Sequence, residues 1–328
     1  MYQAATENSI HPADALYKRI ILMFFMRKRN GNMNTMKCQI FLKTVELGSF
    51  TRAAETLGYT QSAVSRSIAD LEREWNMTLL SRNKDGIILN SQGKELLPYI
   101  QSLCNAQRAL EDQISEMHEL VRGTLRVGTF TSVSIHWLPS MIKDFLDQYP
   151  GIQFELVNKW EFAEVEDLIA RGEVDCGFLG LPVSDTLESF FLFQDRLLTV
   201  LPSGHPLATA DYYPISCFRK DPYIRSQETW DKEISRIFLE EGLRPNIRYT
   251  VNDDFAILAM VEQGLGISIQ SELVVKGACR QLAAIPLERP RFRQIGLAVR
   301  RKEPLAPLTR RFIDFVLQWH REKMTSQQ

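Results

Sequence analysis

The chain has 328 residues, of which 45% are hydrophobic and 24% are charged, and its formal net charge at pH 7 is −1. This length exceeds what one ordinary core organises, so two or three domains are expected, and the apolar content excludes a disordered protein. The first 92 residues carry 12 Lys and Arg against 8 Asp and Glu, and the remainder carries 27 against 32. This weak basic excess suits DNA binding through a few defined contacts rather than through a large basic surface.

Residues 1–32 are expected to form a poorly ordered extension. Their only apolar run, 20–26, is too short to span a bilayer, which takes about 20 residues. The basic residues 27–29 follow this run, whereas a secretion signal carries its positive charge before the apolar core. A basic arm that contacts a membrane or nucleic acid is the alternative. A true translation start at Met33 or Met36 would remove the extension altogether.

Residues 33–92 are predicted to form a winged helix-turn-helix domain. A first helix, capped by Ser49 or Thr51, leads into a turn at Gly58. A second helix follows, and Asp-Gly in the turn at 83–86 predicts a short hairpin after it. A pair of amphipathic helices in a helical core would explain the helices but not the hairpin. The arrangement therefore predicts a helix that enters the major groove of DNA.

The predicted second helix, capped by Thr60, has an inner and an outer face. Val64, Ile68 and Leu71 recur at helical spacing and are predicted to face the core. Candidate DNA contacts lie on the outer face, at the start of the first helix and on the hairpin: Thr51, Arg52, Gln61, Ser62, Ser65, Arg66, Arg82 and Lys84. Side chains of the second helix are expected to meet base edges, and those of the hairpin are expected to meet phosphates.

Residues 93–122 are predicted to form a coiled-coil linker helix. Apolar residues recur alternately four and three positions apart up to Val121, and Gln107 is the one polar residue in this series. The predicted dimerisation residues are Leu96, Ile100, Leu103, Leu110, Ile114 and Met117. A core helix of the next domain is the alternative, but the sustained repeat favours pairing with a second copy. Such a homodimer predicts an operator with inverted half-sites.

Residues 123–328 alternate strands and helices, which predicts an α/β domain with a mostly parallel sheet. The first lobe is expected at about 123–193 and 265–328, and the second at about 194–264. Two lobes crossed twice by the chain form a cleft that suits a small ligand. A periplasmic solute-binding protein would share these lobes, but it would need an export signal and would have no use for the winged segment.

Cysteine and histidine spacing predicts neither a metal site nor an enzyme. The five cysteines show no CxxC spacing, which excludes a zinc ribbon and indicates a reducing cytoplasm. A redox switch at Cys217, beside two cations, is the alternative to an idle thiol. The five histidines lie far apart, and neither GxxxxGK[ST] nor GxSxG occurs. No catalytic residue, metal or cofactor is therefore predicted.

From Met33 onward the chain resembles the LysR-type transcriptional regulators. The resemblance rests on FLKTVELGSFTRAA from Phe41, QSAVSRSI from Gln61, LPSGHPLA from Leu201 and VEQGLGI from Val261. It implies a winged domain that reads DNA, a helix that dimerises, and two lobes that bind a metabolite effector. It also implies dimers that pair into tetramers and bend the promoter, with RNA polymerase as a candidate partner.

The chain departs from the family pattern in two short stretches. Leu80 stands where the family usually has Phe before the wing, and Asn90 stands where Thr usually begins the linker helix. Leu80 is still apolar, and Asn90 or Ser91 can still cap a helix. Neither change alters the prediction.

The resemblance also places an effector site between the lobes. Carried over by position, its residues are Thr129, Thr131, Ser132, Pro202, Arg225, Ser226 and Asn252. Hydroxyls and N–H groups at the start of a helix could hold a carboxylate, and Arg225 would supply its bidentate partner. The alternative is that the hydroxyls only cap the helix and Arg225 forms an ordinary ion pair. His136 follows the hydroxyls and could line the cleft.

Overall fold

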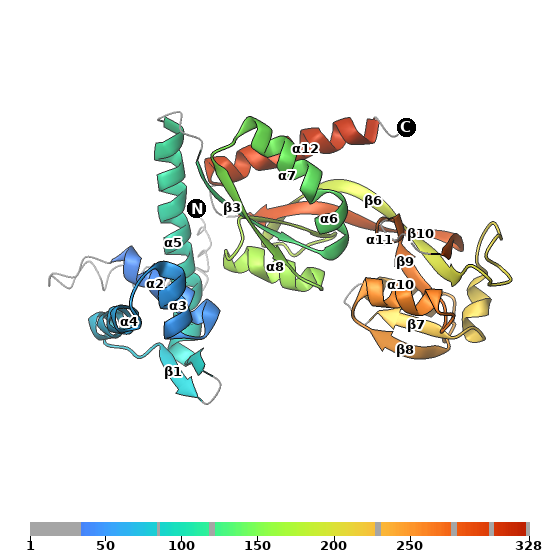
Figure 1. The fold of residues 1–328 in the computed structure, drawn as a ribbon, viewed down its shortest axis with the longest axis horizontal. Coiled ribbons are helices and arrows are strands. Elements are labelled where there is room, and N and C mark those ends of the chain that lie inside the picture. Colours follow the sequence, from blue (N-terminus) through green and yellow to red (C-terminus); the bar gives the residue numbers. More distant parts are fainter. Residues whose placement is uncertain are drawn as a thin grey trace, which may run out of the picture. The chain divides into compact units, whose positions relative to one another are not determined.

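The computed structural model describes residues 34–83, 86–117, 122–226, 231–276, 281–301 and 305–325 (Figure 1). The chain forms two compact units, Met1–Glu95 and Leu96–Gln328. Helix α5 (Ser91–Met117) carries the chain from the first unit to the second. The predicted extension 1–32 lies outside the described residues.

The first unit contains three helices and a hairpin. In chain order its elements are α2 (Thr35–Leu47), α3 (Phe50–Leu57), α4 (Gln61–Trp75), β1 (Leu80–Asn83) and β2 (Gly86–Leu89). The helices enclose a small core that includes Phe41, Ala54 and Val64. Strands β1 and β2 pair antiparallel, with Leu80 opposite Leu89. The predicted helix-turn-helix and hairpin are confirmed, although Lys84 in the turn lies outside the described residues.

Local interactions explain where the helices of the first unit begin and end. The Ser49 hydroxyl accepts a hydrogen bond from the Arg52 N–H at 3.4 Å, so Ser49 rather than Thr51 caps α3. Gly58 ends α3 with φ of 71°, a backbone conformation that favours glycine. The Thr60 hydroxyl accepts from the Ala63 N–H at 3.2 Å and caps α4, as predicted.

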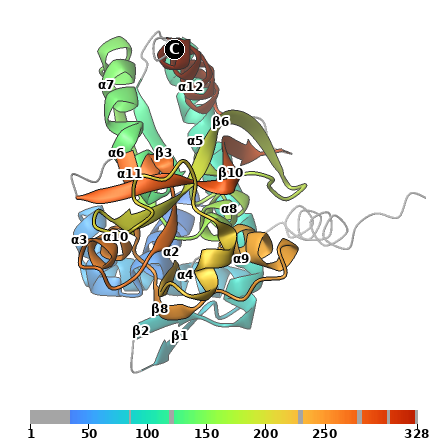
Figure 2. The ribbon, with the colours of Figure 1, turned by 90° about the vertical axis from the view of Figure 1, so that its right-hand side faces the viewer.

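The second unit alternates strands and helices (Figures 1 and 2). In chain order its elements are β3 (Gly123–Thr129), α6 (Thr131–His136), α7 (Leu138–Gln148), β4 (Ile152–Asn158), α8 (Phe162–Arg171), β5 (Cys176–Gly180), β6 (Leu187–Pro202), the 3-10 helix η1 (Ile215–Arg219), β7 (Tyr223–Ser226), α9 (Asp231–Glu240), β8 (Ile247–Val251), α10 (Asp254–Glu262), β9 (Ser268–Ser271), α11 (Glu272–Lys276), β10 (Leu282–Arg300) and α12 (Pro307–Thr325).

The main sheet is mixed rather than mostly parallel, which corrects the prediction. Its strand order is β4-β3-β5-β10-β6-β9, and only the pairings of β3 with β4 and with β5 are parallel. The long strands β6 and β10 run antiparallel from one lobe into the other (Figure 2). The sequence pattern predicted only part of β6 and of β10. Parallel strands are joined by a helical crossover that is visible in the local sequence, whereas these two antiparallel strands pair over a long range without one.

Two of the hydrophobic cores of this unit mark its two lobes. The first lobe is built on residues such as Val127, Phe145 and Phe312, and the second on residues such as Tyr213 and Phe238. The chain was expected to return to the first lobe at about 265. Instead, the second core includes Ile267, Ile269, Ile285 and Leu287, so the return occurs within β10. Strand β9 pairs with the end of β6 that lies in the second lobe, so β9 belongs to the second lobe as well.

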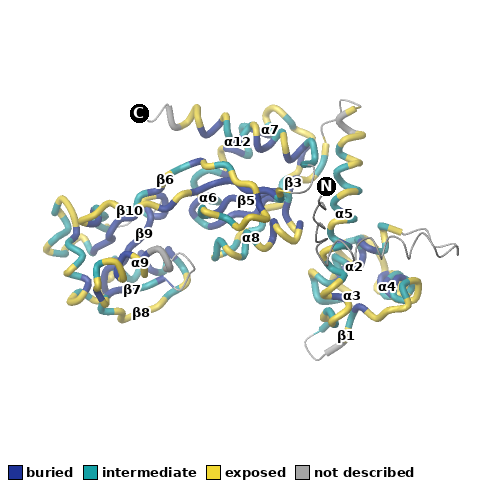
Figure 3. Tube along the Cα trace, turned by 180° about the vertical axis from the view of Figure 1, so that it is seen from behind, coloured by how far each residue is buried: buried dark blue, intermediate teal, exposed yellow. Residues whose placement is uncertain are grey.

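The segment that follows β3 forms two helices rather than one. Helix α6 begins at Thr131, and Trp137 separates it from α7, where Pro139 lies in the first turn. Proline suits a first helical turn but interrupts a continuing helix. Figure 3 shows buried residues along β5, and buried residues also concentrate in the C-terminal parts of β6 and β10. Within the described residues, no helix is long and apolar enough to cross a membrane.

Candidate DNA-reading and effector sites

The outer face of α4 presents polar side chains to solvent. Gln61, Ser62 and Arg66 are exposed, and Ser65 is half-buried. On the inner face Val64, Ile68 and Leu71 are almost fully buried, as predicted, and they fix which side of the helix remains outside. The Ser62 hydroxyl lies 3.1 Å from that of Thr60. The first turn of α4 is therefore ordered by its own hydroxyls.

Arg52 has a structural contact that the sequence did not predict. Its guanidinium donates a hydrogen bond to the carbonyl oxygen of Leu47 at the end of α2. A cation at this end also interacts favourably with the helix dipole. Thr51, the other candidate at the start of α3, is exposed. Arg52 thus stabilises the corner between α2 and α3.

Glu72 anchors the wing, and the sequence analysis did not single it out. Its Oε1 accepts hydrogen bonds from the N–H groups of Leu79, at 2.6 Å, and Leu80, at 3.1 Å. At the other strand, the Ile87 N–H donates to the Gly48 carbonyl oxygen at 3.1 Å. The hairpin is therefore tied to both α4 and the α2–α3 turn. The side chains of the predicted phosphate contacts Arg82 and Lys84 lie outside the described residues.

Helix α5 begins directly against the wing. The Asn90 Oδ1 accepts from the Gly93 N–H at 2.8 Å, and the Asn90 side-chain amide donates to the Thr78 carbonyl at 2.7 Å. This confirms Asn90 as the cap of the linker helix. A Cβ on Gly93 would lie 2.2 Å from the Leu79 carbonyl oxygen, so only glycine allows this approach.

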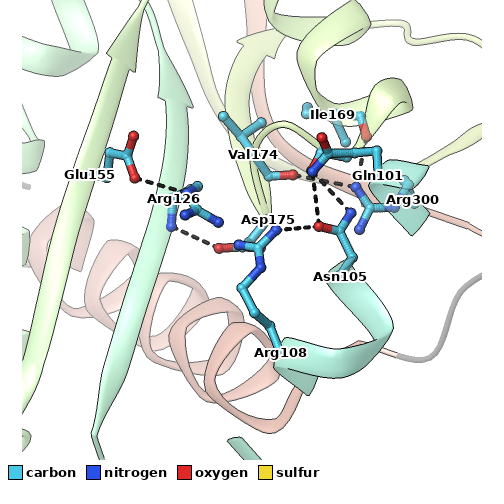
Figure 4. Close-up of polar contacts among 10 residues, drawn as sticks. Gln101, Asn105, Arg108, Arg126, Glu155, Ile169, Val174, Asp175 and Arg300 are labelled. Atoms are coloured by element: carbon cyan, nitrogen blue, oxygen red, sulfur yellow. Dashed lines mark hydrogen bonds and ion pairs between the residues drawn. The ribbon is translucent and has the colours of Figure 1, made fainter. Parts of the chain in front are cut away.

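One face of α5 is hydrogen-bonded to the first lobe (Figure 4). The side-chain amides of Gln101 and Asn105 both donate to the Gly172 carbonyl oxygen, at 3.1 and 3.0 Å. Arg300 donates to the carbonyls of Ile169, at 3.0 Å, and Val174, at 3.4 Å. We call these contacts, with Arg108 and Asp175, the latch. The latch therefore supplies side-chain donors to backbone carbonyls at and just beyond the end of α8.

Asp175 in the latch and Asp112 on α5 have raised pKa values. Burial raises the pKa of Asp175, although the hydrogen bond from the Arg126 N–H at 2.8 Å and the Arg126 charge oppose the shift. Burial, with the charges of Asp175 and Glu111, raises the pKa of Asp112 to about 6. Arg108 lies 4.0 Å from Asp175. Burial therefore makes both carboxyl groups bind protons more readily than exposed aspartates do.

The predicted coiled-coil seam is exposed along its C-terminal half. Leu110, Ile114 and Met117 are 60%, 47% and 77% exposed, which is unusual for three neighbouring apolar side chains (Figure 3). Ile100, by contrast, is buried within the single chain, and Leu96 and Leu103 are half-buried. The apolar surface still lacking a partner in the described part of this chain therefore lies at 110–117. Val121 lies outside the described residues.

The first-lobe effector candidates gather where β3 ends and α6 begins. Thr129 and Ser132 are buried, and Thr131 is half-buried in the first turn of α6. The Ser134 hydroxyl donates to the Thr129 hydroxyl at 3.2 Å and approaches the Asn158 amide oxygen at 3.3 Å. Among the described residues, no side chain caps α6. These hydroxyls therefore do not serve merely as helix caps.

Ser132 belongs to a buried ionic network that the sequence did not predict. Arg293 donates to the Ser132 hydroxyl at 2.9 Å and forms an ion pair with Asp195 at 2.7 Å. Arg293 and Asp195 face each other across β10 and β6 and are 3% and 0% exposed. The second Asp195 oxygen accepts from the Leu273 N–H at 3.1 Å. The network therefore links both crossing strands to α6 and α11.

The second-lobe candidates lie at strand ends. Arg225 and Ser226 end β7, and Asn252 follows β8, which runs parallel to β7 with Ser226 opposite Val251. These three residues therefore share one end of the small sheet. Ser226 is buried and Asn252 is exposed. Pro202 lies apart from them at the end of β6.

Other titratable groups fit no catalytic or metal site. His136 is half-buried, and burial and the charge of Lys276 lower its pKa, opposed by Asp195. Among the described residues, no group of His, Cys, Asp or Glu is arranged to hold a metal ion. Cys217 packs against the second-lobe core, as an idle thiol would, and Cys279 lies outside the described residues. A Cys217 redox switch has no structural support.

A winged helix-turn-helix followed by a linker helix and a two-lobed α/β domain defines a DNA-binding regulator with a ligand-binding domain. The family model described as "Bacterial regulatory helix-turn-helix protein, lysR family" matches residues 36–94, and that of the "LysR substrate binding domain" matches 118–321. The chain therefore belongs to the LysR family of transcriptional regulators.

Curated relatives match nearly the whole chain. The uncharacterized HTH-type transcriptional regulator YvbU of Bacillus subtilis is 27% identical over 81% of this chain and 92% of its own length. The transcriptional dual regulator GltC of the same organism is 28% identical over 88% and 97%. These relatives are regulators and not enzymes, which agrees with the absence of a predicted catalytic residue.

Solved structures share the fold. A full-length OxyR variant with one substituted cysteine, from Pseudomonas aeruginosa, has a TM-score of 0.69 at 19% identity, covering 89% of this chain and 96% of that one. Full-length CbnR complexed with its target DNA scores 0.62 at 21% identity, covering 87% and 99%. The effector-binding domain of QuiR in complex with shikimate scores 0.56 at 20% identity, covering 61% and 98%.

Proposed function

We propose that the protein is a homodimer, or a pair of homodimers, whose α4 helices read an inverted-repeat operator and whose paired lobes bind a small carboxylate effector. The proposed domain organisation is 33–92 for DNA binding, 93–122 for pairing and 123–328 for the effector, with the second lobe extended to about 287. One observation carries the DNA-binding part: an ordered α4 presents Gln61, Ser62 and Arg66 outward from a fixed inner face. CbnR, whose full-length structure was solved with its target DNA, supports the same partner.

Sequence-specific contacts are assigned to α4 and nonspecific contacts to the wing. Gln61 and Arg66 can form bidentate hydrogen bonds with bases, whereas Arg82 and Lys84 can neutralise phosphates. Thr51, Ser62 and Ser65 supply hydroxyls for either kind of contact. Arg52 is assigned to the phosphate backbone and to the α2–α3 corner, where its guanidinium already binds the Leu47 carbonyl.

Pairing is assigned to the exposed end of the coiled-coil seam. Leu110, Ile114 and Met117 offer an apolar stripe that a second α5 would cover. Gln107 can fix the register of such a pair at some cost in stability. A two-fold pair of α4 helices then requires two inverted half-sites, about one helical turn of DNA or a multiple of it apart.

The effector is assigned to the segment around α6 and the ends of β7 and β8. Thr131, Ser132 and the N–H groups of the first α6 turn suit an anionic group, and Arg225 suits the opposite side of a carboxylate. Thr129, Pro202, Ser226 and Asn252 complete the proposed lining. QuiR, whose effector domain was solved with shikimate, supports a small-molecule effector of this size. No cofactor or metal is needed for this function.

Genome-wide occupancy of the protein on its own chromosome tests the proposal directly. Sites with inverted half-sites beside genes for a metabolite would support it, and the neighbouring genes would name candidate effectors for calorimetry. Occupancy without sequence preference would contradict the DNA-reading role. Arg225→Ala with unchanged induction by a bound acid would contradict the carboxylate role.

Two further assignments complete the proposal. As a DNA-binding regulator with scattered cysteines, the protein is placed in the cytoplasm, where RNA polymerase is its candidate partner at promoters. The extension 1–32 is assigned no role in DNA binding. A gel-shift assay of the chain without these residues is expected to show unchanged affinity, and lost binding would contradict that assignment.

A further inference from the structure

Asp254 is a buried carboxylate with an oxygen that receives no hydrogen bond within the described part of the chain. It opens α10, is 7% exposed, and its Oδ1 accepts from none of the described residues. Helix α10 is capped by the neighbouring residue instead, since the Asp253 Oδ1 accepts from the Ala256 N–H at 2.9 Å. Burying an unpaired carboxylate is costly, so a group retained in this state requires a reason.

Arg293 does not donate a hydrogen bond to this buried Asp254 oxygen. The Arg293 charge attracts Asp254 and partly offsets the effect of burial on its pKa, which still rises to about 6. The guanidinium of Arg293, however, is hydrogen-bonded to Asp195 and Ser132. The other charged groups on α10 and on the elements around it are Asp253 at the N-cap of α10, Glu262 on α10, Glu188 and Arg196 on β6, Arg225 on β7 and Arg248 on β8. Burial is the main cause of the raised pKa of Asp254; among the charged groups, Arg293 lowers this pKa and Asp253 raises it.

Asp254 is close in the sequence to one effector candidate and is attracted by the arginine that binds another. It follows Asn252 by two positions, and through Arg293 it is electrostatically connected to Ser132 on α6. A second acceptor is left open nearby in the same lobe: Gln270 on β9, a strand against which α10 packs, is 0% exposed, and its Oε1 has no partner among the described residues. Two buried acceptors without donors favour a ligand that brings donors of its own.

We propose that Asp254 accepts a hydrogen bond from a hydroxyl or ammonium group of the effector, so that the effector is an acid that also carries a donor. This inference rests on the proposed effector site and adds a requirement to it. The hydroxyls of α6 and Arg225 hold the acid group, and Asp254 selects against acids that lack the donor. A site that hydrogen-bonds a ligand donor strongly rejects analogues without it, because its own buried acceptor is then left unpaired.

The test compares acids of equal size that differ only in the donor. The probes are propionate, lactate and alanine; succinate, malate and aspartate; and glutarate, 2-hydroxyglutarate and glutamate. Binding is measured by calorimetry and by the shift in Tm of the full chain. At least one hydroxy or amino acid is expected to bind at least 10-fold more tightly than its unsubstituted counterpart. The proposal would be overturned if the three acids of every set that binds had equal affinities. It would also be overturned if only the unsubstituted acids bound.

Two variants of Asp254 separate the kinds of donor. Asp254→Ala removes the acceptor and should lower the affinity for hydroxy acids and for amino acids at least 10-fold. Asp254→Asn keeps an acceptor oxygen but loses the charge. It should therefore lower affinity at least 10-fold only for ligands whose donor is an ammonium group. Asp253→Asn is the matched control, because it makes the same charge change one residue away and Asn also caps helices. Equal losses in Asp253→Asn and Asp254→Asn would contradict a specific contact.

A measurement without ligand keeps the inference testable if none of these acids binds. In the free protein at pH 7.5, Asp254→Asn should raise Tm by several degrees, because the variant no longer buries a charge that only a ligand would satisfy. A lowered Tm would show that Asp254 is structural and would overturn the inference. A raised Tm with no binding of any acid would instead contradict the carboxylate part of the proposed function. Arg225→Ala reports on that part separately.

Discussion

The side-chain amide of Asn105 lies 3.0 Å from the carbonyl oxygen of Gly172, and this hydrogen bond fastens the linker helix to the end of α8. Gly172 ends α8 with φ of 71°, and a Cβ there would lie 2.3 Å from the Asn105 amide nitrogen. The latch therefore depends on a glycine for both backbone conformation and space.

Gly172→Ala is expected to lower the free energy of unfolding by about 1 kcal/mol, because alanine is strained in the left-handed backbone conformation. The new methyl group should lower it further by displacing the side chains of Asn105 and Arg300. Gly242→Ala is the matched control, since Gly242 has φ of 58° but no atom within 4 Å of its missing Cβ. Urea denaturation of both variants should show the larger loss for Gly172→Ala. Equal losses would mean that the latch contributes nothing beyond backbone strain.

Gln61→Ala and Arg66→Ala are each expected to cost about 1 to 3 kcal/mol of binding free energy on the operator and to relax preference at one base position. Fluorescence anisotropy with operator and random DNA measures both effects. Arg82→Ala and Lys84→Ala should weaken binding to both DNAs equally and reduce its salt dependence. An equal effect of Gln61→Ala on operator and random DNA would remove Gln61 from base reading.

Glu72→Ala should loosen the wing, because the N–H groups of Leu79 and Leu80 lose their acceptor. The expected loss of stability is about 1 to 3 kcal/mol. Affinity should also fall for every DNA sequence, because the wing no longer has a fixed position. Glu74→Ala on the same helix breaks only a surface ion pair with Lys37 and should cost less than about 1 kcal/mol. Denaturation and anisotropy would reject the anchoring role if the two variants behave alike.

Leu110→Asp and Ile114→Asp should abolish pairing while leaving each chain folded, because both side chains are exposed in the single chain. Sedimentation velocity measures the loss of dimer, and circular dichroism checks the fold. Ile100→Asp should instead reduce stability, since Ile100 is 3% exposed before any partner binds. A dimer that survives both seam substitutions would place the interface elsewhere.

Asp112 is expected to make stability fall as pH rises. Its pKa is raised to about 6 in the folded chain, from an ordinary value of 3.8, mainly by burial. The protonated form therefore favours folding, fully below pH 3.8, and this contribution is lost as pH rises through 6. Asp112→Asn should flatten the decline in the urea midpoint between about pH 4.5 and 7.5. An unchanged pH profile would show that Asp112 does not titrate in this range.

The DNA-reading half of the molecule was predictable because its signals are local. Ser49, Gly58 and Thr60 act within a few residues of their positions, and Asp-Gly specifies a tight turn. The anchoring role of Glu72 was not predictable in the same way. Its partners, seven and eight residues away, depend on how the wing folds back.

The effector half was predicted only in outline because its contacts are long-range. Asp195 and Arg293 are separated by 98 residues, and no spacing rule connects them. The same holds for the latch, in which Asn105 meets a carbonyl 67 residues away. Long antiparallel strands rather than helical crossovers join the lobes, so the predicted boundary at 265 was placed too early.

Helix α5 is continuous from Gly93, which approaches the Leu79 carbonyl, to Gln101 and Asn105, which bind the Gly172 carbonyl. Each helical residue adds about 100° of rotation and about 1.5 Å of rise. The spacing of four residues between Gln101 and Asn105 therefore places both amides on one side of α5, where both can donate to the Gly172 carbonyl. A single alanine inserted between them would turn one amide away, and the Gly172 carbonyl would lose one of its two side-chain donors.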